Sequence, residues 1–600
     1  MPTSANDVIL RRLRGVVCTI VALASTTFLA EGMTADSVTI MQIQGRGQFS
    51  EYVNTQVETH GIVTLYTKNG ANFWLQDAKG DDSRETSDGI FVAAGAFPPS
   101  GIKPDTGDLI RIVAEVQEKK FGTALPLTRL RRVKQIDVLS KGNVFPAAVK
   151  LTLLPSESIE QGIAFWESLE GMLVTLSDAR VVAPTTRFGE FALLSKPNRT
   201  HGSGYYADSG HLLLRSLGEQ AVDYNPERIL VDDGTLQRPI IVRPGDEVVS
   251  LLAVVDYTYS NYKLQPLQFT LDVHEIEKDP IRRPSSRDSD AQELTLATFN
   301  VENLFDLLNN PGKKDRRNTP SELELEIKLN KLALAIQHEL ALPDILVVQE
   351  IENIAILKTL AKRINSQAQS GYEAVSFESS DVRGIEVGFM WNKSRVELKS
   401  AQQMAGAKVT QAFGMESTSP GREPLIGLFE FNGVEITVIG NHFKSKGGDD
   451  SLFGMNQPPQ RNSEVQRKLQ AQVVRDYVDS ILEANINASI VVTGDLNDFQ
   501  FAEPGEGSDH PVAILEGKKQ AFELSNLIEK VKPAQRFTYV FNGNAQVLDH
   551  ILVSRALLDN IKKVEIPHFN SNAPATLVSD PNTPRRSSDH DPIRASFRIE

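Results

Sequence analysis

The stretch Ile490-Val491-Val492-Thr493-Gly494-Asp495-Leu496-Asn497-Asp498-Phe499 decides the fold prediction. Its apolar, β-branched first half predicts a buried strand, and in an extended continuation Asp495 and Asn497 project to the same side. A carboxylate and an amide are therefore expected together at the end of a strand. Taken alone, such a residue is usually a turn residue that hydrogen-bonds its own backbone.

Five other strand-like runs end in the same way. They are Leu294 to Phe299 before Asn300, Asp344 to Gln349 before Glu350, Glu435 to Gly440 before Asn441-His442, Val547-Leu548 before Asp549-His550, and Ser587-Ser588 before Asp589-His590. Turn chemistry does not require acid, amide and imidazole side chains to recur together. Hard divalent cations bind carboxylate and amide oxygens, and phosphoryl chemistry uses histidines beside them. The joint pattern predicts a single pocket.

These residues resemble the ordered motifs of the endonuclease/exonuclease/phosphatase superfamily. The motifs are residues 297–305 (ATFNVENLF), 348–353 (VQEIEN), 440–446 (GNHFKSK), 493–497 (TGDLN), 548–551 (LDHI) and 588–592 (SDHDP). The resemblance is strongest to bacterial secreted nucleases that carry β-rich modules ahead of the catalytic domain. It implies a metal-dependent phosphodiesterase whose catalytic domain is an α/β two-sheet sandwich flanked by helices, with the site at one edge.

The metal ligands expected from this resemblance are oxygen donors. Glu350 is the first choice, with Asn300 and Asp589 beside it or bridging through water. Ligation by oxygen alone indicates Mg²⁺ or Mn²⁺, possibly Ca²⁺. Asp495 and Asn497 are expected to orient the attacking water and hold the scissile phosphate.

Two His-carboxylate pairs are expected to supply acid-base catalysis. In the first, Asp549 fixes the tautomer of His590 and stabilises its charged form. His550 should point the other way in a strand and is not expected to be catalytic. By resemblance to pancreatic deoxyribonuclease, the second pair is His442 with Glu386.

The loop that follows His442 contains candidate substrate-binding residues. Lys446 and Arg461 are expected to reach flanking phosphates, and Asn441 to contact substrate beside His442. Long loops that contain Gly and Pro beside a site usually touch substrate.

The N-terminus predicts export. Three arginines, Arg11, Arg12 and Arg14, precede an apolar stretch from Val16 to Ala30, which indicates a signal peptide within residues 1–32. We expect a secreted or periplasmic, monomeric protein with no membrane span after processing. The formal net charge of −14 argues against a protein that coats nucleic acid broadly, but it does not exclude a nuclease.

Two β-rich modules are expected ahead of the catalytic domain. Short alternating strands over residues 36–142 predict a barrel that resembles an oligonucleotide-binding (OB) fold, and residues 149–276 loosely repeat it. In the first, Phe73, Trp74 and Phe121, with the basic run Arg129 to Lys134, either form a stacking platform or fill and solvate the barrel. A polar linker, residues 279–290, separates the modules from a catalytic domain, residues 291–600, which we expect to fold and act without them.

Three functions are compatible with these features. A secreted nuclease acting on DNA, possibly RNA, is favoured by the OB-like modules. The alternative is a phosphodiesterase of the same fold that acts on phospholipid head groups, such as those of sphingomyelin or a phosphoinositide. A binding protein with a dead site is disfavoured because none of the main motif residues is missing.

Overall fold

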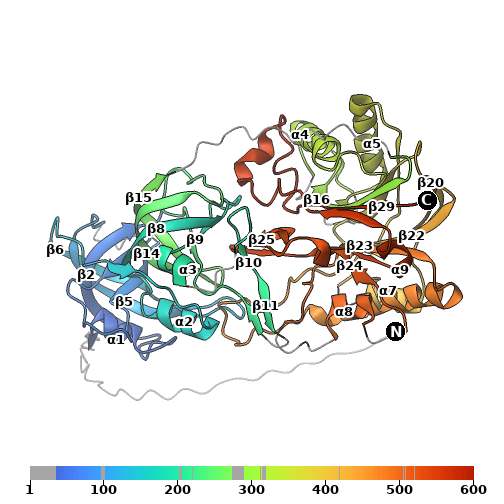
Figure 1. Ribbon diagram of the computed structural model, residues 1–600. Helices are drawn as coiled ribbons and strands as arrows, with labels where there is room; N and C mark the ends of the chain where they lie inside the picture. Colours follow the sequence, from blue (N-terminus) through green and yellow to red (C-terminus); the bar gives the residue numbers. More distant parts are fainter. Residues whose placement is uncertain are drawn as a thin grey trace, which may run out of the picture.

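The computed structural model describes residues 36–95, 102–201, 206–218, 221–272, 290–310, 313, 319–417, 419–503, 506, 509–518 and 521–600 (Figure 1). The expected signal peptide and most of the expected linker, residues 279–289, lie outside these ranges. Within them, no helix combines the length and apolar character needed to cross a membrane. The two barrels lie on one side of the molecule in Figure 1, and the two-sheet sandwich lies on the other.

The first sheet of the sandwich has six strands in the order β18-β19-β17-β16-β29-β28. The strands are β16 (Glu293–Leu304), β17 (Ile345–Ile351), β18 (Tyr372–Ser376), β19 (Glu386–Asn392), β28 (Ile561–Glu565) and β29 (Ile593–Arg598). Strands β16 and β17 are parallel, and β16 runs antiparallel to β29. Polar groups that follow β16 and β17 therefore meet at one edge of the sheet.

The second sheet has the order β20-β21-β22-β23-β27-β24. Its strands are β20 (Glu397–Gln403), β21 (Leu425–Phe431), β22 (Val434–His442), β23 (Ser489–Asp495), β24 (Ser525–Asn526) and β27 (Asp549–Val553). Strands β22 and β23 are parallel, so that His442 is paired with Asp495. The strand predicted from Ile490 is β23, and it ends at Asp495.

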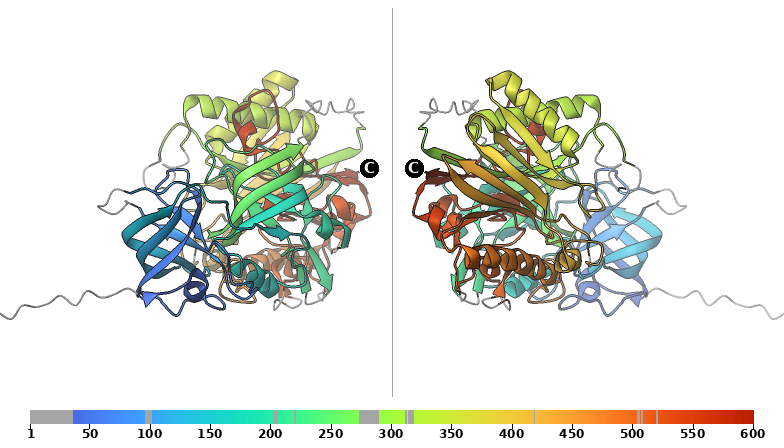
Figure 2. Two further views of the ribbon diagram at one scale, coloured as in Figure 1. Left: turned by 90° about the vertical axis from the view of Figure 1, so that its left-hand side faces the viewer. Right: turned by 90° about the vertical axis from the view of Figure 1, so that its right-hand side faces the viewer.

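Three apolar layers hold the sandwich together. Residues such as Phe389, Phe429 and Val438 fill the space between the sheets. The helices α4 (Glu322–Leu334) and α5 (Ile354–Ala368) cover the outer face of the first sheet, and α7 (Glu464–Ala484) and α8 (Pro511–Glu516) cover that of the second (Figures 1 and 2). The expected two-sheet sandwich flanked by helices is the architecture of this part of the chain.

The two β-rich modules close in the same way. Barrel 1 contains β2 (Gln56–Tyr66), β3 (Phe73–Gln76), β4 (Gly89–Ala93), β5 (Leu109–Lys119) and β6 (Leu127–Ser140), and β2 pairs with β5 to close the ring. Barrel 2 contains β8 (Leu173–Ala183), β9 (Phe191–Leu194), β13 (Ile229–Val231), β14 (Glu247–Thr258) and β15 (Asn261–Asp272), closed by β14 and β8. In each ring the third strand pairs in parallel with the fifth. The loose sequence repeat therefore corresponds to a repeated topology.

The two aromatic residues of β3 face opposite sides of the strand. Phe73 is wholly buried in the interior of barrel 1, so filling of the barrel is the right alternative for it. Trp74 is nearly buried too, but in the contact with Leu173 and Val254 of barrel 2, so it neither fills the barrel nor forms an open stacking surface. Phe121 remains exposed, with the Lys119 ammonium 4.1 Å from its ring centre.

Barrel 2 shares a sheet with the catalytic domain, so the two regions are in direct contact. Between β9 and β13 it carries α3 (Lys196–His201), β10 (Leu212–Leu213), β11 (Arg215–Gly218) and β12 (Ala221–Asp223). Strand β10 pairs with β26 (Asn544–Gln546), which forms a hairpin with β25 (Tyr539–Phe541). The two regions thus share a small sheet, which lies between them in Figure 1.

The catalytic domain also sends a side chain into barrel 2. Phe453, from the loop between β22 and α7, lies in the apolar core of the barrel, and the Tyr257 hydroxyl donates to its carbonyl at 2.7 Å. A fragment starting at residue 291 would expose this phenyl ring to water. The expectation that residues 291–600 fold and act without the barrels stays a prediction, and this contact argues against it.

Candidate active site

Asp495 lies at the centre of the polar edge where the two sheets meet. Its Oδ2 accepts a hydrogen bond from Asn300 Nδ2 at 3.0 Å. The same oxygen is 3.4 Å from His442 Nε2 and 4.0 Å from His590 Nε2. Three of the expected residues, drawn from three separate motifs, therefore surround the carboxylate of a fourth. Burial raises the pKa of Asp495 to about 7.

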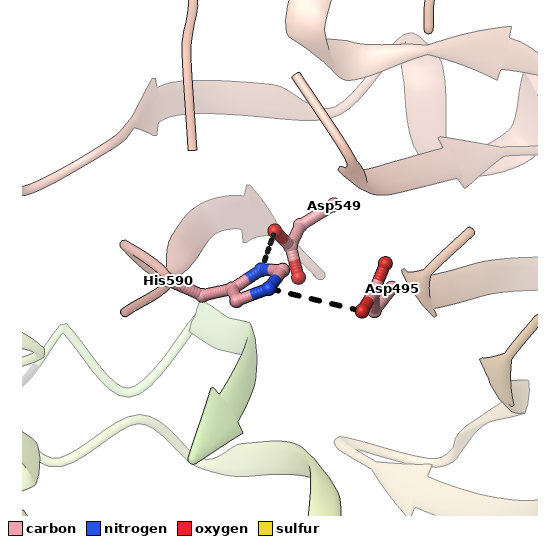
Figure 3. A group of neighbouring side chains, drawn as sticks. All are labelled: Asp495, Asp549 and His590. Atoms are coloured by element: carbon pink, nitrogen blue, oxygen red, sulfur yellow. Dashed lines mark hydrogen bonds and ion pairs between the residues drawn. The ribbon is translucent and has the colours of Figure 1, made fainter. Parts of the chain in front are cut away.

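His590 forms the expected pair with Asp549 (Figure 3). Its Nδ1 is 2.7 Å from Asp549 Oδ2, so its Nε2 is directed toward Asp495. The ring also packs against Tyr539, with centroids 4.7 Å apart. Burial alone lowers the pKa of His590, but the nearby carboxylates, Asp549 above all, outweigh it and hold the pKa well above its usual value.

A network of hydrogen bonds holds the loop that carries His590. Asn570 Nδ2 donates to the His590 carbonyl at 2.7 Å, and its oxygen accepts from the Ser587 amide at 3.0 Å. The Ser588 hydroxyl donates to the Asn300 carbonyl at 2.7 Å. These bonds join the final motif to the first across 288 residues of sequence.

Three carboxylates gather beside Asp495: Glu302, Glu350 and Asp589. Burial, followed by the charge of Asp589, raises the pKa of Glu302, and Glu350 acts in the same direction. Glu350 has a positive φ of 64° and accepts from the Asn303 amide at 3.0 Å. A group of crowded, partly buried oxygen donors fits a hard divalent cation, whose charge would relieve their repulsion.

Asn300 is close to this group, but its amide is turned away from the expected role. Its nitrogen donates to Asp495, while its oxygen accepts from the Glu302 amide at 3.0 Å. Lys328, on α4, lies near the same carboxylates and donates to the Ser587 carbonyl at 2.6 Å. Its ammonium partly balances the negative charge.

The expected pair of His442 and Glu386 is not formed. His442 Nε2 faces Asp495 at 3.4 Å and Glu350 at 3.9 Å. Glu386 lies near Ser379 instead, and burial raises its pKa to about 8. The physical reason is strand alternation. In β19, Val387 faces the core between the sheets, so its neighbour Glu386 faces the other side.

Side chains also alternate along β22, so Asn441 faces away from the site. Its side chain is wholly buried, and its nitrogen donates to the carbonyls of Ile439 at 2.9 Å and Thr493 at 3.3 Å. The expected contact with substrate is therefore wrong, and Asn441 holds β22 and β23 together. Asn497 does face the site: it lines the cavity beside Asp495, and its amide donates to the Phe443 carbonyl at 3.2 Å.

Lys446 and Arg461 lie beside the site, held by one buried carboxylate. Glu503 is 3.0 Å from Lys446 Nζ and 2.5 Å from Arg461 Nη2. Tyr224, from barrel 2, donates to Glu503 at 2.7 Å and accepts from Arg461 at 2.8 Å. The two cations therefore line the cavity in positions that barrel 2 helps to fix.

His550 has a structural environment, as expected. It is wholly buried, with Nε2 2.9 Å from the Asp498 carbonyl and Nδ1 3.0 Å from Asn526. Sequence reasoning missed Glu302, although alternation from Asn300 could have indicated it. It also missed Tyr539 and Tyr224, for which the sequence carries no comparable signal.

Two cavities meet at the acidic group. One, of about 330 Å³, is lined by the loop between β8 and β9 together with Glu302. The other, of about 490 Å³, is lined by the β14–β15 hairpin together with His442, Asp495 and His590. Glu350 and Asp589 line both. The candidate site thus lies between the sandwich and barrel 2.

Family comparison assigns a class to the sandwich. Residues 295–573 match the endonuclease/exonuclease/phosphatase family, and residues 140–275 match a domain of unknown function, DUF8508. The first match ends before Asp589 and His590, but the fold places both residues in the candidate site. No curated protein matches the chain significantly.

Several solved structures resemble about half of the chain. TDP2 from D. rerio, humanized by 14 mutations, shares 20% identity over 51% of this chain and 99% of that chain, with a TM-score of 0.34. An endonuclease/exonuclease/phosphatase from Bacteroides vulgatus shares 15% identity over 51% and 99%, with a TM-score of 0.32. A mannosyl-6-phosphatase from Bacteroides thetaiotaomicron shares 15% over 50% and 98%, also with a TM-score of 0.32. Similarity at this level does not indicate a substrate.

Proposed function

Because residues 295–573 belong to the endonuclease/exonuclease/phosphatase superfamily, we propose that the protein is a divalent-metal-dependent nuclease that cuts DNA, possibly RNA, endonucleolytically. The observation that carries this proposal is that Asp495, which lies between two imidazoles, lines the same cavity as Glu350 and Asp589. That arrangement provides oxygen ligands, a group to orient water and a charged histidine within one cavity. It suits hydrolysis of a phosphodiester.

Glu350 and Asp589, with Glu302, would hold Mg²⁺ or Mn²⁺, possibly Ca²⁺. The bound ion would neutralise the phosphate and the negative charge that develops during hydrolysis. Asp495 accepts a hydrogen bond from the attacking water, and Asn497 holds a phosphate oxygen. His590, fixed by Asp549, presents an N–H at Nε2 to the phosphoryl group. A positioned acid or base of this kind contributes roughly 10²–10⁴-fold to the rate.

His442 has a different role in this scheme. Burial holds its pKa well below the usual value, and Arg422 and Arg383 act in the same direction. It is therefore neutral in the described structure, unlike His590. We assign it to orienting Asp495, 3.4 Å away, instead of the paired role with Glu386.

The barrels favour a polymer substrate. We propose that both barrels are OB-like modules that bind nucleic acid. The support is that each is a closed ring of five strands in which the third strand pairs with the fifth and the first with the fourth. We further propose that the enzyme is secreted or periplasmic, on the basis of the N-terminal sequence described above, and that it acts as a monomer. Export would place it where extracellular nucleic acid is the available substrate.

The test is purified full-length protein on supercoiled plasmid, RNA and sphingomyelin vesicles, with excess chelator or with added Mg²⁺, Mn²⁺ or Ca²⁺. We expect metal-dependent nicking of plasmid and no release of phospholipid head groups. Head-group release without cleavage of nucleic acid would replace the nuclease with the phospholipid phosphodiesterase. Plasmid cleavage in excess chelator would contradict the metal requirement.

A further inference from the structure

Barrel 2 places exposed aromatic side chains around the acidic group. We infer that the site takes an unpaired nucleic-acid strand, whose bases stack on Phe188, Phe541 and Tyr259 on either side of the scissile phosphate. This inference rests on the proposed nuclease function and adds to it a preference for a single strand over a duplex. The three side chains are called the aromatic groove below.

Phe188 stands on a tight turn in the loop between β8 and β9. The Thr186 amide donates to the Glu190 carbonyl at 2.8 Å, and the Gly189 amide donates to the Thr186 carbonyl at 3.1 Å. Gly189 has φ +81°, and a Cβ there would meet the Asp233 carboxylate at 2.2 Å. The turn is therefore well defined, and it leaves the Phe188 ring 66% exposed within the smaller cavity.

Tyr259 stands on the two-residue turn between β14 and β15. Tyr259 and Ser260 have φ of 50° and 59°, as in the hairpin turns that match strand twist. The side chain is 90% exposed in the larger cavity. The ring is therefore open to contact with a ligand that enters this cavity.

One buried lysine ties these two turns together. Lys263 is 1% exposed, and its ammonium lies 5.0 Å from the Tyr259 ring centre. The same ammonium is paired with Glu190, in the turn that carries Phe188, and with Asp232 at 3.2 Å. Phe188 and Tyr259 are therefore held in a fixed relation to each other.

Phe541 joins the two cavities. It lies at the end of β25, is 56% exposed and lines both. The hairpin that carries it is anchored to barrel 2, because Arg228 Nε donates to the Asn542 carbonyl at 2.5 Å. The aromatic groove thus runs from one cavity to the other past Glu350 and Asp589.

The chemistry of the groove favours bases over lipid. Arg187 lies 4.9 Å from the Phe188 ring centre, and Arg586 lines the same cavity. Aromatic rings interleaved with cations are the usual means of binding a single strand, whereas the bases of a duplex are stacked on each other and unavailable. The rings also line cavities of ligand size rather than forming one protruding apolar patch.

The experiment compares Phe188→Ala, Tyr259→Ala and Phe541→Ala with Phe49→Ala in the full-length protein. Phe49, in barrel 1, is a matched exposed phenylalanine at 54% that lines neither cavity. Steady-state cleavage is measured on a 20-nucleotide single strand and on the same sequence as a duplex, and thermal melting checks folding. Hydrolysis of bis(p-nitrophenyl) phosphate by the wild type tests the proposed function separately.

We expect the wild type to prefer the single strand, and each groove variant to raise KM for it roughly 10-fold, in keeping with the loss of one stacked base. Phe49→Ala should match the wild type. Equal KM for wild type and all groove variants, or a wild-type preference for the duplex, would overturn the inference while leaving the nuclease intact. Binding to sphingomyelin vesicles that the groove variants lose would also overturn it. Failure of the wild type on every phosphodiester would instead reject the proposed function.

Discussion

Barrel 1 and barrel 2 share one strand order but differ in what surrounds them. Barrel 1 packs against barrel 2 through Trp74 and Leu65, which meet Leu173 and Val254 in an apolar contact. Barrel 2 instead carries an insertion and two turns that reach the catalytic cavities. A shared barrel topology therefore does not determine what each barrel does. The role of each barrel depends on the segments added between its strands.

The comparison assigns the chemistry to the sandwich and substrate positioning to barrel 2. The largest loss of turnover should therefore come from the sandwich. His590→Ala should reduce plasmid nicking about 10²–10⁴-fold, because it removes a positioned imidazole. His550→Gln is the control, because His550 lies on β27 next to Asp549 but faces away from the site, toward Asp498 and Asn526. It should lower thermal stability but preserve turnover per folded molecule. Equal losses of turnover in the two variants would contradict this assignment.

Two substitutions of buried aromatic residues test whether the two barrels differ in their effect on catalysis. Phe453→Ala and Trp74→Ala each remove a buried aromatic side chain and should each lower the free energy of unfolding by about 3–5 kcal/mol. Only Phe453→Ala should also reduce kcat/KM of the remaining folded protein, because Phe453 anchors the loop that carries Lys446 and Arg461. Denaturant unfolding and steady-state cleavage measure the two quantities. Similar activity losses in both variants would erase the distinction.

Removal of single hydroxyl groups gives a smaller test. Tyr224→Phe deletes the barrel 2 hydroxyl that bonds Glu503 and Arg461, whereas Tyr66→Phe deletes a barrel 1 hydroxyl that donates to the Pro104 carbonyl at 2.6 Å. Each should cost about 1 kcal/mol of stability. Tyr224→Phe alone should raise KM for the oligonucleotide a few-fold. An unchanged KM would mean that barrel 2 does not position these cations.

A last expected effect, on stability alone, concerns pH and the contact between barrel 2 and the sandwich. His211, in the barrel 2 insertion, packs against Phe537 with ring centroids 4.9 Å apart, and its Nε2 lies 3.4 Å from the Ser571 carbonyl. Burial lowers its pKa to about 3, below the value near 6.5 of the unfolded chain. The unfolded state therefore binds more protons, and the stability due to neutral His211 falls as pH drops below about 6.5.

His211→Gln isolates this contribution. Between pH 7 and pH 5 the wild type should lose more unfolding free energy than the variant, by less than about 1.4 kcal/mol per pH unit. Chemical denaturation at both pH values measures the difference. Parallel losses in the two proteins would show that His211 does not titrate in this way.

Much of the sandwich could be predicted from the sequence, because polar residues of the same types recur, in order, at the ends of the predicted strands. Asp495, Asp549, His442 and His590 meet as expected. The parallel strands β22 and β23 end at His442 and Asp495, whereas Asp549 and His590 lie at or just before the starts of β27 and β29, which run antiparallel to β23 and β16. The predictions failed where they depended on which face of a strand a side chain occupies. Glu386 and Asn441 have suitable chemistry but the wrong parity along β19 and β22.

The packing of barrel 2 against the sandwich could not be predicted from the sequence. Phe453 looked like part of a polar loop, and nothing local in the chain links it to Tyr257, 196 residues away. Tyr224 and Tyr259 likewise reach the site only through the packing of two separate regions. Contacts of this kind depend on tertiary structure, which single-sequence periodicity does not encode.

The most direct test of the central claim is calorimetric titration of Mn²⁺ into wild type and Glu350→Gln, with plasmid nicking measured on the same samples. Glutamine keeps the shape of Glu350 but removes the charge that would hold the ion. We predict that the variant melts like the wild type yet loses metal affinity and nicks plasmid slower by orders of magnitude. Wild-type nicking by Glu350→Gln would contradict the account.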